Sequence, residues 1–156
     1  MPMLNVQILH GHSPASKTDL LKKLTQSVVD SIAAPLASVR VVLQEIPAEH
    51  VIVAGELGKE MVMITVGLIR GRTEEQKAAL IAAMADATER AIGVSKQNIR
   101  VILFDRPATD FGVAGGITET ICLVRCKGRF GRPTSGGWAD IMMNLHFEND
   151  IEWAHV

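Results

Sequence analysis

The apolar positions along the chain follow two different periods, which predict strands and helices in turn. Residues 3–9 and 62–69 are rich in apolar and β-branched residues, a composition typical of strands that are covered on at least one face. After the first of these stretches, apolar residues recur at helical spacing and predict a helix with one apolar face that ends near Ala33. These apolar positions are Leu20, Leu24, Val28 and Ile32.

Local start and stop signals bracket this helix and a second one. Ser13 followed by Pro14 is an N-cap with proline at the first helical position. The run TEEQ at residues 73–76 has the form of a capping box, which predicts a second helix that runs to about Ile92. Gly93 then stands where a helix-terminating glycine is expected.

Each helix is followed by a second predicted strand, at residues 39–46 and 99–105. Two strands joined by a helical crossover are expected to be parallel, with a right-handed connection. After each second strand the sequence has a Pro-Ala turn and a short hairpin that ends in glycine. The sequence therefore predicts an α/β (α+β) fold, a four-stranded βαββαβ sheet with two helices on one face. Its exposed edges and uncovered apolar surface favour oligomerisation.

The two halves of this pattern form an internal repeat. Residues 2–56 align with residues 62–116 at a constant shift of 60 positions, without an insertion. SVRVVLQEIPAEHVIVAGE lies over NIRVILFDRPATDFGVAGG, and a register kept over this length favours duplication and fusion. We therefore expect one fused domain of two βαβ units, followed by a C-terminal extension at 117–156. In the extension we expect a strand or hairpin, a loop and a short amphipathic segment that packs between subunits.

Composition and charge limit the classes of protein to which the chain can belong. Of the 156 residues, 47% are hydrophobic and 21% charged, so a packed domain is expected rather than disorder. A formal net charge of -1 gives no strong field for nucleic acid. No apolar run reaches the ~18 residues of a membrane span, and the first residues do not have the form of a secretion signal, so we expect a cytoplasmic protein. Cys122 and Cys126 have no partners for a zinc site, and we expect plain thiols.

The N-terminus, MPMLNV, is the first candidate for chemistry. Methionine is usually removed when a small residue such as proline follows it, so the mature chain would begin at Pro2 with a free secondary amine. An α-amino group titrates at about 7.7–8.0, and burial or a nearby cation lowers that pKa. Such an amine can act as a general base near pH 7. Proline at position two is also common without any catalytic role, so its meaning depends on the residues around it.

Together with the βαβ repeat, Gly11, the SVRV strand and the FGVAGG hairpin, Pro2 gives the chain a resemblance to the tautomerase superfamily. More narrowly, the chain resembles a fused form of 4-oxalocrotonate tautomerase, in which one chain carries two of the family's short subunits. The resemblance covers residues 2–116. It implies an isomerase without a cofactor, assembled as a trimer of fused chains in place of the family's hexamer.

The resemblance places the family's catalytic groups unevenly on the two units. Its proline falls on Pro2 in the first unit and on Val62, inside the chain, in the second. Its arginine after glycine falls on His12 in the first unit and on Arg72 in the second. Because the family's pocket borrows groups from neighbouring subunits, a site at Pro2 would take Arg72 from the other half of its own chain. We therefore expect one working site per chain and three per trimer.

The remaining family residues fall in the second strand and the hairpin. The strand arginine is kept in both units, as Arg40 and Arg100, whereas the hairpin aromatic falls on Val51 in the first unit and on Phe111 in the second. We leave open which of the two arginines enters the Pro2 site from an adjacent chain, and whether they instead pair with acidic groups between chains. Phe111 is a candidate both for the pocket and for the core.

The activity that the resemblance implies is proton transfer within a small enol or dienol acid, such as a 2-hydroxymuconate or an arylenolpyruvate. The neutral nitrogen of Pro2 would take the enol proton and return one to carbon. A guanidinium binds a carboxylate through two hydrogen bonds without competing as a base, which suits Arg72 and one strand arginine. Arg70 adds a second cation nearby, and Phe111 would keep the pocket dry and lower the pKa of the amine. This chemistry needs no cofactor and no metal.

Two other functions fit parts of the same pattern. A hydratase of the cis-3-chloroacrylic acid dehalogenase kind also has a fused chain and paired arginines like Arg70 and Arg72, but it uses a tyrosine and a glutamate. This chain has no tyrosine, and Val113 stands where the acid would be expected. A βαββαβ chain is also compatible with a non-catalytic ligand-binding or assembly module. Retention of Met1 would make the Pro2 nitrogen an ordinary amide and favour that module.

Overall fold

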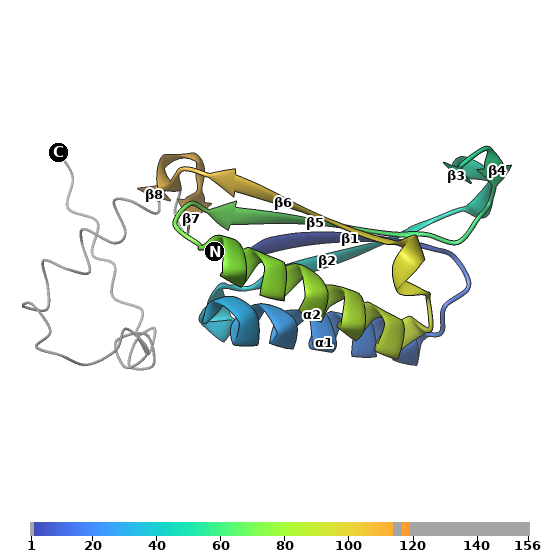
Figure 1. The fold of residues 1–156 in the computed structure, drawn as a ribbon, viewed down its shortest axis with the longest axis horizontal. Helices are drawn as coiled ribbons and strands as arrows, with labels where there is room; N and C mark the ends of the chain where they lie inside the picture. Colours follow the sequence, from blue (N-terminus) through green and yellow to red (C-terminus); the bar gives the residue numbers. More distant parts are fainter. Residues whose placement is uncertain (1, 114–116, 119–156) are drawn as a thin grey trace, which may run out of the picture.

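A computed structural model of the chain describes residues 2–113 and 117–118. It consists of a β-sheet with a layer of helices on one side (Figure 1). The helices are α1 (Pro14–Ile32) and α2 (Glu74–Ile92), with short 3-10 turns η1 (Leu36–Ser38), η2 (Ala48–His50), η3 (Lys96–Asn98) and η4 (Ala108–Asp110). The strands are β1 (Met3–Leu9), β2 (Arg40–Ile46), β3 (Ile52–Val53), β4 (Glu56–Leu57), β5 (Val62–Ile69), β6 (Ile99–Arg106), β7 (Gly112–Val113) and β8 (Ile117–Thr118).

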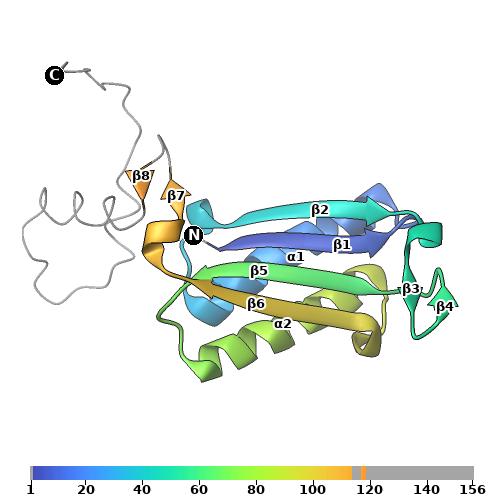
Figure 2. The same ribbon diagram turned by 90° about the horizontal axis from the view of Figure 1, so that it is seen from above.

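The main sheet has four strands in the order β2-β1-β5-β6 (Figure 2). β1 is parallel to β2 and β5 is parallel to β6, while the two central strands, β1 and β5, are antiparallel. Met3 lies opposite Gly67, and Ile8 lies opposite Val62. The start of β1 is therefore beside the end of β5, and each end of the sheet combines residues from both halves of the sequence.

The helices α1 and α2 lie side by side across one face of the sheet (Figure 2). α1 begins after Ser13, whose hydroxyl accepts a hydrogen bond from a backbone N–H of the first turn. α2 begins after Thr73 with a complete capping box, in which Thr73 and Gln76 each accept a bond from the other's backbone N–H. Both helices end at a residue in the left-handed conformation, Ala33 with φ 50° and Gly93 with φ 74°.

The core lies between the helices and the sheet. Alternate residues of β1 and β5 are buried against one face of each helix. They are Leu4, Val6 and Ile8 of β1, Val62, Ile64, Val66 and Leu68 of β5, Leu20, Leu24, Val28 and Ile32 of α1, and Leu80, Met84 and Ala87 of α2. Since burial of a large aliphatic side chain contributes roughly 1.5–3 kcal/mol, this layer holds the helices on the sheet.

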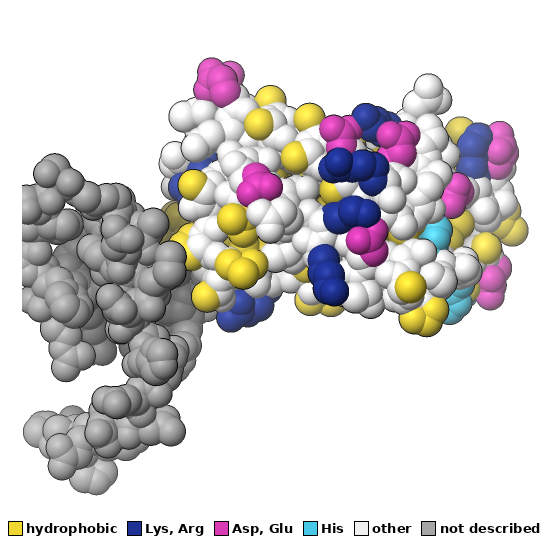
Figure 3. Space-filling view, turned by 90° about the horizontal axis from the view of Figure 1, so that it is seen from below, with side chains coloured by type: hydrophobic (Ala, Val, Ile, Leu, Met, Phe, Trp, Pro, Cys, Tyr) yellow, Lys and Arg dark blue, Asp and Glu magenta, His cyan; other side chains and the backbone are white. Residues whose placement is uncertain are grey.

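The two outer surfaces of the molecule differ in character. The helical side carries basic and acidic side chains close to one another, as a solvated surface does (Figure 3). The other face of the sheet instead exposes large apolar side chains, those of Met3, Val42, Ile102 and Phe104. An apolar sheet face of this kind is expected to be covered by another chain.

The predicted α/β (α+β) fold, with four strands and two helices on one face, is confirmed. The second strands differ from the prediction by one residue each. β2 begins at Arg40 because the N–H of Val39 closes the preceding 3-10 turn on the carbonyl of Leu36. β6 continues to Arg106 because that residue still pairs with Ile69 of β5.

The predicted C-terminal extension falls almost entirely on residues that the structure does not describe. Residues 114–116 and 119–156, which include Cys122 and Cys126, lie outside the described residues. In the described part of the chain, neither helix combines the length and the apolarity that a membrane crossing requires.

Candidate active site

One end of the sheet gathers most of the residues that the sequence singles out. The start of β1 lies beside the start of β2 and the end of β5, and β5 in turn lies beside the end of β6. At this end Arg40, Met3, Gly67 and Phe104 are level with one another across the four strands. We call it the proline end, because Pro2 directly precedes β1.

Pro2 is buried at the point where the chain enters the sheet. Its carbonyl oxygen accepts a hydrogen bond of 3.0 Å from the backbone N–H of Arg40. This bond extends the ladder between β1 and β2 by one residue and fixes the backbone of the proline. A base at this position would be held by the sheet and shielded from bulk water.

Phe111 reaches the proline end from the segment that follows β6. Its side chain is 8% exposed, and its Cζ lies 3.8 Å from the position that a β-carbon on Gly67 would occupy. Gly67 alternates with the buried Val66 and Leu68, so the aromatic ring covers the face of the sheet away from the helices. Since Gly67 is opposite Met3, the ring lies beside the start of β1.

Arg70 and Arg72 follow the end of β5 and also lie at the proline end. The backbone N–H of Arg70 donates to the carbonyl of Arg106, the last residue of β6, at 2.9 Å. Gly71 turns the chain with φ 117°, a conformation that favours glycine. Arg72 is half-buried and directly precedes Thr73, the N-cap of α2. A cation beside a helix N-terminus is mildly unfavourable, which favours a functional reason for this arginine.

Arg40 and Arg100 occupy equivalent positions at the start of β2 and near the start of β6. Each uses one Nη atom to donate to two nearby backbone carbonyls, Arg40 to Ala37 and Val39 at 2.7 and 3.0 Å, and Arg100 to Gln97 and Ile99 at 2.6 and 3.1 Å. Arg40 lies opposite Met3 at the proline end, whereas Arg100 lies opposite Met63 at the other end of the sheet. Within one chain, Arg40 is therefore the strand arginine near Pro2, and Arg100 is remote from it.

Arginines and lysines differ in how they pair. Among the residues that the structure describes, every salt bridge uses a lysine: Lys17–Glu45, Lys23–Asp19, Lys59–Glu56, Lys77–Asp105, and Lys96 with Asp86 and Glu89. In this part of the chain, no salt bridge neutralises Arg40, Arg70, Arg72 or Arg106. The proline end thus offers positive charge to an anionic ligand.

The other end of the sheet has the repeat-equivalent positions but different residues. The equivalent pairs, with the proline end first, are Pro2 and Val62, Gly67 and Gln7, Arg70 and His10, Arg72 and His12, Arg106 and Ile46, and Phe111 and Val51. Val62 is buried within the chain and therefore has no free amine. Gln7 stands at the position equivalent to Gly67, and its side-chain amide donates a hydrogen bond to Gln44 at 3.3 Å. Gly67 has no side chain and so leaves space for the aromatic ring. Of the two ends of the described sheet, the proline end alone combines a proline next to the start of the chain, an aromatic ring and a pair of arginines.

Two residues at the proline end, Phe104 and Arg106, belong to none of the motifs in the sequence. Their only signal is the repeat, in which they stand where the first unit has Gln44 and Ile46. Their location follows from the register of β5 and β6, which puts Phe104 opposite Gly67. That register is set by tertiary structure and is not visible in a local pattern.

The carboxyl groups whose pKa is shifted are exposed or half-buried, and their shifts have local causes. The hydrogen bond from Lys17 holds the pKa of Glu45 below its usual range, and Lys96 does the same for Asp86. At the start of α2, the pKa of Glu75 is lowered by hydrogen bonds from the backbone N–H of Glu75 itself and from the Thr73 hydroxyl. These groups remain ionised at pH 7 and are not suited to be the base. The described residues also contain no cluster of three or more His, Cys, Asp or Glu that could hold a metal ion.

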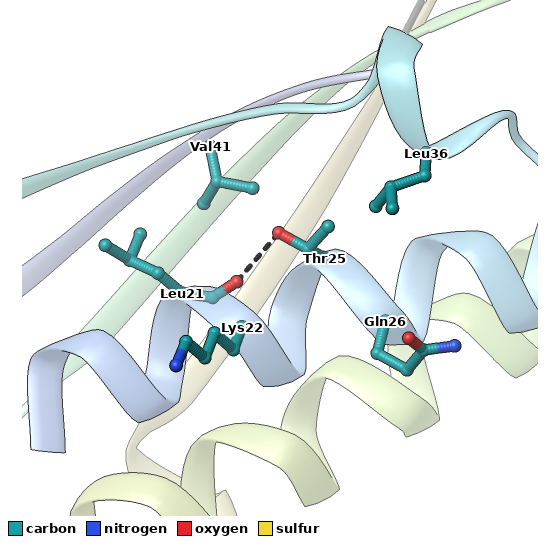
Figure 4. A pocket seen from close by; sticks show the side chains of 6 residues that line it. All are labelled: Leu21, Lys22, Thr25, Gln26, Leu36 and Val41. Atoms are coloured by element: carbon teal, nitrogen blue, oxygen red, sulfur yellow. Dashed lines mark hydrogen bonds between the residues drawn. The ribbon is translucent and has the colours of Figure 1, made fainter.

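A hollow on the surface lies elsewhere, between α1, η1 and β2 (Figure 4). It has a volume of about 400 Å³ and is lined by Leu21, Lys22, Thr25, Gln26, Leu36 and Val41. The hydroxyl of Thr25 is already used, since it donates to the carbonyl of Leu21 at 2.8 Å. The lining includes none of the candidate site residues and no acid or aromatic group, so we do not assign the chemistry to this hollow.

Comparisons with known proteins match both units of the chain. The family model described as tautomerase enzyme matches residues 2–61 and again residues 63–120. A probable tautomerase of Ralstonia nicotianae is 44% identical over 55 residues, which are 35% of this chain and 79% of that protein. The 2-hydroxymuconate tautomerase of Pseudomonas putida is 36% identical over 61 residues, 39% of this chain and 97% of that protein. A solved fused 4-OT, described as a wild-type symmetric trimer, is 52% identical with a TM-score of 0.76, covering 77% of this chain and 98% of its own.

Proposed function

Because the chain belongs to the tautomerase family, we propose that it is a cofactor-independent isomerase that moves a proton within enol or dienol acids, with the amine of Pro2 as general base. The observation that carries this proposal is the convergence at the proline end. There a buried proline, an aromatic ring over Gly67 and arginines without acidic partners among the described residues come together. The substrate class is an enol acid of the 2-hydroxymuconate or phenylenolpyruvate type.

The proposed reaction needs one base and no redox step. The neutral nitrogen of Pro2 accepts the proton of the enol hydroxyl, and the electron pair left on oxygen forms the C=O bond. The carbon–carbon double bond shifts its electrons to the next carbon, or along the conjugated system in a dienol. That carbon takes a proton from the protonated amine, which returns to its neutral state.

The surroundings of Pro2 favour the neutral amine that this reaction requires. An ordinary α-amino group has a pKa of about 7.7–8.0. Burial and nearby cations both disfavour the protonated form and lower that pKa. Pro2 is buried, and among the described residues Arg40, Arg70, Arg72 and Arg106 are cations at its end of the sheet. Lowering the pKa by about one unit would leave roughly half of the amine or more neutral at pH 7.

Arg72 is the proposed partner of the charge that develops on the substrate. It is half-buried at the end of β5, where a guanidinium can bind the carboxylate through two hydrogen bonds or stabilise the oxygen on carbon 2. Arg40, whose guanidinium is already fixed on one side by two carbonyls, is placed to bind the substrate within the same chain. Phe111 excludes water from the space beside the start of β1.

We propose that the chain acts as a trimer, as the fused 4-OT relative is described. The face of the sheet away from the helices exposes the apolar side chains of Met3, Val42, Ile102 and Phe104, which neighbouring chains would cover. Arg100, which is remote from Pro2 of its own chain, would then contribute to the site of an adjacent chain. A trimer would have three such sites, one at each Pro2.

The test is the ketonisation of phenylenolpyruvate by wild-type protein and by Pro2→Ala. The wild type is first checked by intact mass for removal of Met1. We expect a wild-type rate well above background, and a fall of about 100-fold or more in the variant, as loss of a general base gives.

A matched control replaces another proline that lies outside the site. Pro47 belongs to the first βαβ unit, where it precedes η2 and lies away from the proline end. Pro47→Ala should retain the wild-type rate within about threefold, since Pro47 is only half-buried and lies outside the proline end. If Pro2→Ala is as active as the wild type, or if the trimmed wild type has no activity, the proposed mechanism fails.

A further inference from the structure

Arg106 lies at the proline end and has no part in the reaction described so far. It is the last residue of β6, lies opposite Ile69, and its carbonyl accepts the backbone N–H of Arg70. We propose that Arg106 is a substrate-binding residue that holds the second, distal carboxylate of a diacid and so makes the site prefer diacids to monoacids. This inference rests on the proposed function, because it assigns a residue to the same site.

The side chain of Arg106 belongs to the face of the sheet on which Phe111 lies. Along β6, Leu103 packs against the core, whereas Phe104 is 48% exposed on the other side. Strand residues alternate between the two faces, so Arg106 shares the face of Phe104. The ring of Phe111 covers Gly67 on that same face. Arg106 and the aromatic ring thus border one surface at the end of the sheet.

The distance between Pro2 and Arg106 suits a short diacid. The ladders place Met3 opposite Gly67 and Ile69 opposite Arg106, so Pro2 and Arg106 are two strands apart. Strand spacing of about 4.8 Å and a rise of about 3.4 Å per residue put their backbones about 10 Å apart. A six-carbon diacid whose reacting end is at Pro2 would therefore extend into the range of an arginine side chain at 106.

The repeat shows that the fold does not need an arginine at this position. The equivalent residue is Ile46, which ends β2 in the same way. The carbonyl of Ile46 accepts the N–H of His10 at 3.0 Å, compared with 2.9 Å for Arg106 and Arg70. Two strand ends with the same backbone geometry thus differ in side chain, and the arginine is on the end that has the proline.

The acidic residue next to Arg106 in the sequence is already paired with a lysine. Asp105, the neighbour of Arg106, forms a salt bridge with Lys77, and the equivalent Glu45 forms one with Lys17. In the described ranges, Arg106 takes part in no salt bridge. Its charge is therefore available to a carboxylate that comes from a ligand.

The inference is tested by binding, with two probes that have the same carbon skeleton. Hexa-2,4-dienedioate has two carboxylates and hexa-2,4-dienoate has one, and neither has the hydroxyl needed for tautomerisation. Calorimetry at pH 7.5 compares the wild type, Arg106→Gln, Arg106→Lys and the control Arg90→Gln. Arg90 lies in the last turn of α2, and its Nε donates to the backbone carbonyl of Asp86.

We expect Arg106→Gln to weaken binding of the diacid by about 10- to 100-fold, as loss of a charged hydrogen bond does, and to change binding of the monoacid by less than about twofold. Arg106→Lys should recover part of the loss, and Arg90→Gln should bind both acids as the wild type does. Equal weakening of both acids, or no preference for the diacid in the wild type, would overturn the role of Arg106. A diacid preference that depends on Arg106 in a protein without isomerase activity would instead reject the proposed function and leave this inference standing.

Discussion

Replacing Ala33 by glycine should stabilise the protein. Ala33 is the C-cap of α1, with φ 50° and ψ 39°, and its repeat equivalent at the end of α2 is Gly93, with φ 74° and ψ 7°. Both residues are exposed, and a β-carbon built on Gly93 would meet no atom within 4 Å. The difference between the two caps is therefore one of backbone conformation and not of packing.

The magnitude follows from two opposing terms. A residue with a β-carbon loses about 1–2 kcal/mol in the left-handed conformation, which glycine does not. Glycine also makes the unfolded chain more flexible, which costs about 0.4–1 kcal/mol. Ala33→Gly should thus raise the free energy of unfolding by about 0.5–1 kcal/mol, and Gly93→Ala should lower it by a similar amount.

Urea unfolding followed by circular dichroism measures both changes. All proteins are compared at one protein concentration, because dissociation of an oligomer makes the midpoint concentration-dependent. The midpoint should rise for Ala33→Gly and fall for Gly93→Ala, with the same slope as the wild type. A midpoint that falls for Ala33→Gly would show that α1 does not end in a left-handed residue, and it would refute this reasoning.

Two further predictions concern the assembly and the pH dependence. If Arg100 serves the site of an adjacent chain, mixed oligomers should recover activity when Pro2→Ala and Arg100→Gln chains are unfolded together and refolded. Their activity should exceed the average of the two separate proteins. Activity equal to that average would mean that Arg100 stays outside the site. Because Lys17 lowers the pKa of Glu45, this carboxylate stabilises the fold above its ordinary pKa of about 4.5, and the contribution is lost as pH falls through the lower, folded value. The urea midpoints of the wild type and Glu45→Gln should therefore differ at pH 7 and converge below pH 4.5, and a difference that is unchanged at pH 3 would contradict this role.

The fold was predictable where the signals are local. Ser13 with Pro14 and the capping box that begins at Thr73 place the helix starts, because these residues satisfy backbone groups of the first turn themselves. Gly93 marks the end of α2 because glycine readily adopts the left-handed conformation of a helix C-cap. Ala33 also ends a helix in the left-handed conformation, but alanine carries no such signal, and only the repeat points to it.

The location of the candidate site was predictable only in part, because its residues come together through strand pairing. Pro2, Arg72 and Phe111 could be named from the sequence, but their common location depends on the antiparallel contact between β1 and β5. The same contact separates Arg40 from Arg100, two residues with similar local sequences whose carbonyl partners are repeat-equivalent. No local pattern distinguishes these two arginines.

The most direct test of the proposed mechanism measures turnover against the fraction of chains that begin at Pro2. Protein that retains Met1 is trimmed for different times with a methionine aminopeptidase, intact mass gives the trimmed fraction, and phenylenolpyruvate ketonisation gives the rate. We expect the rate to rise in proportion to that fraction from the uncatalysed background, because the bond to Met1 converts the nitrogen of Pro2 from an amine into an amide that cannot act as a base. Equal rates in fully trimmed and fully untrimmed protein would contradict the assignment of Pro2 as the base.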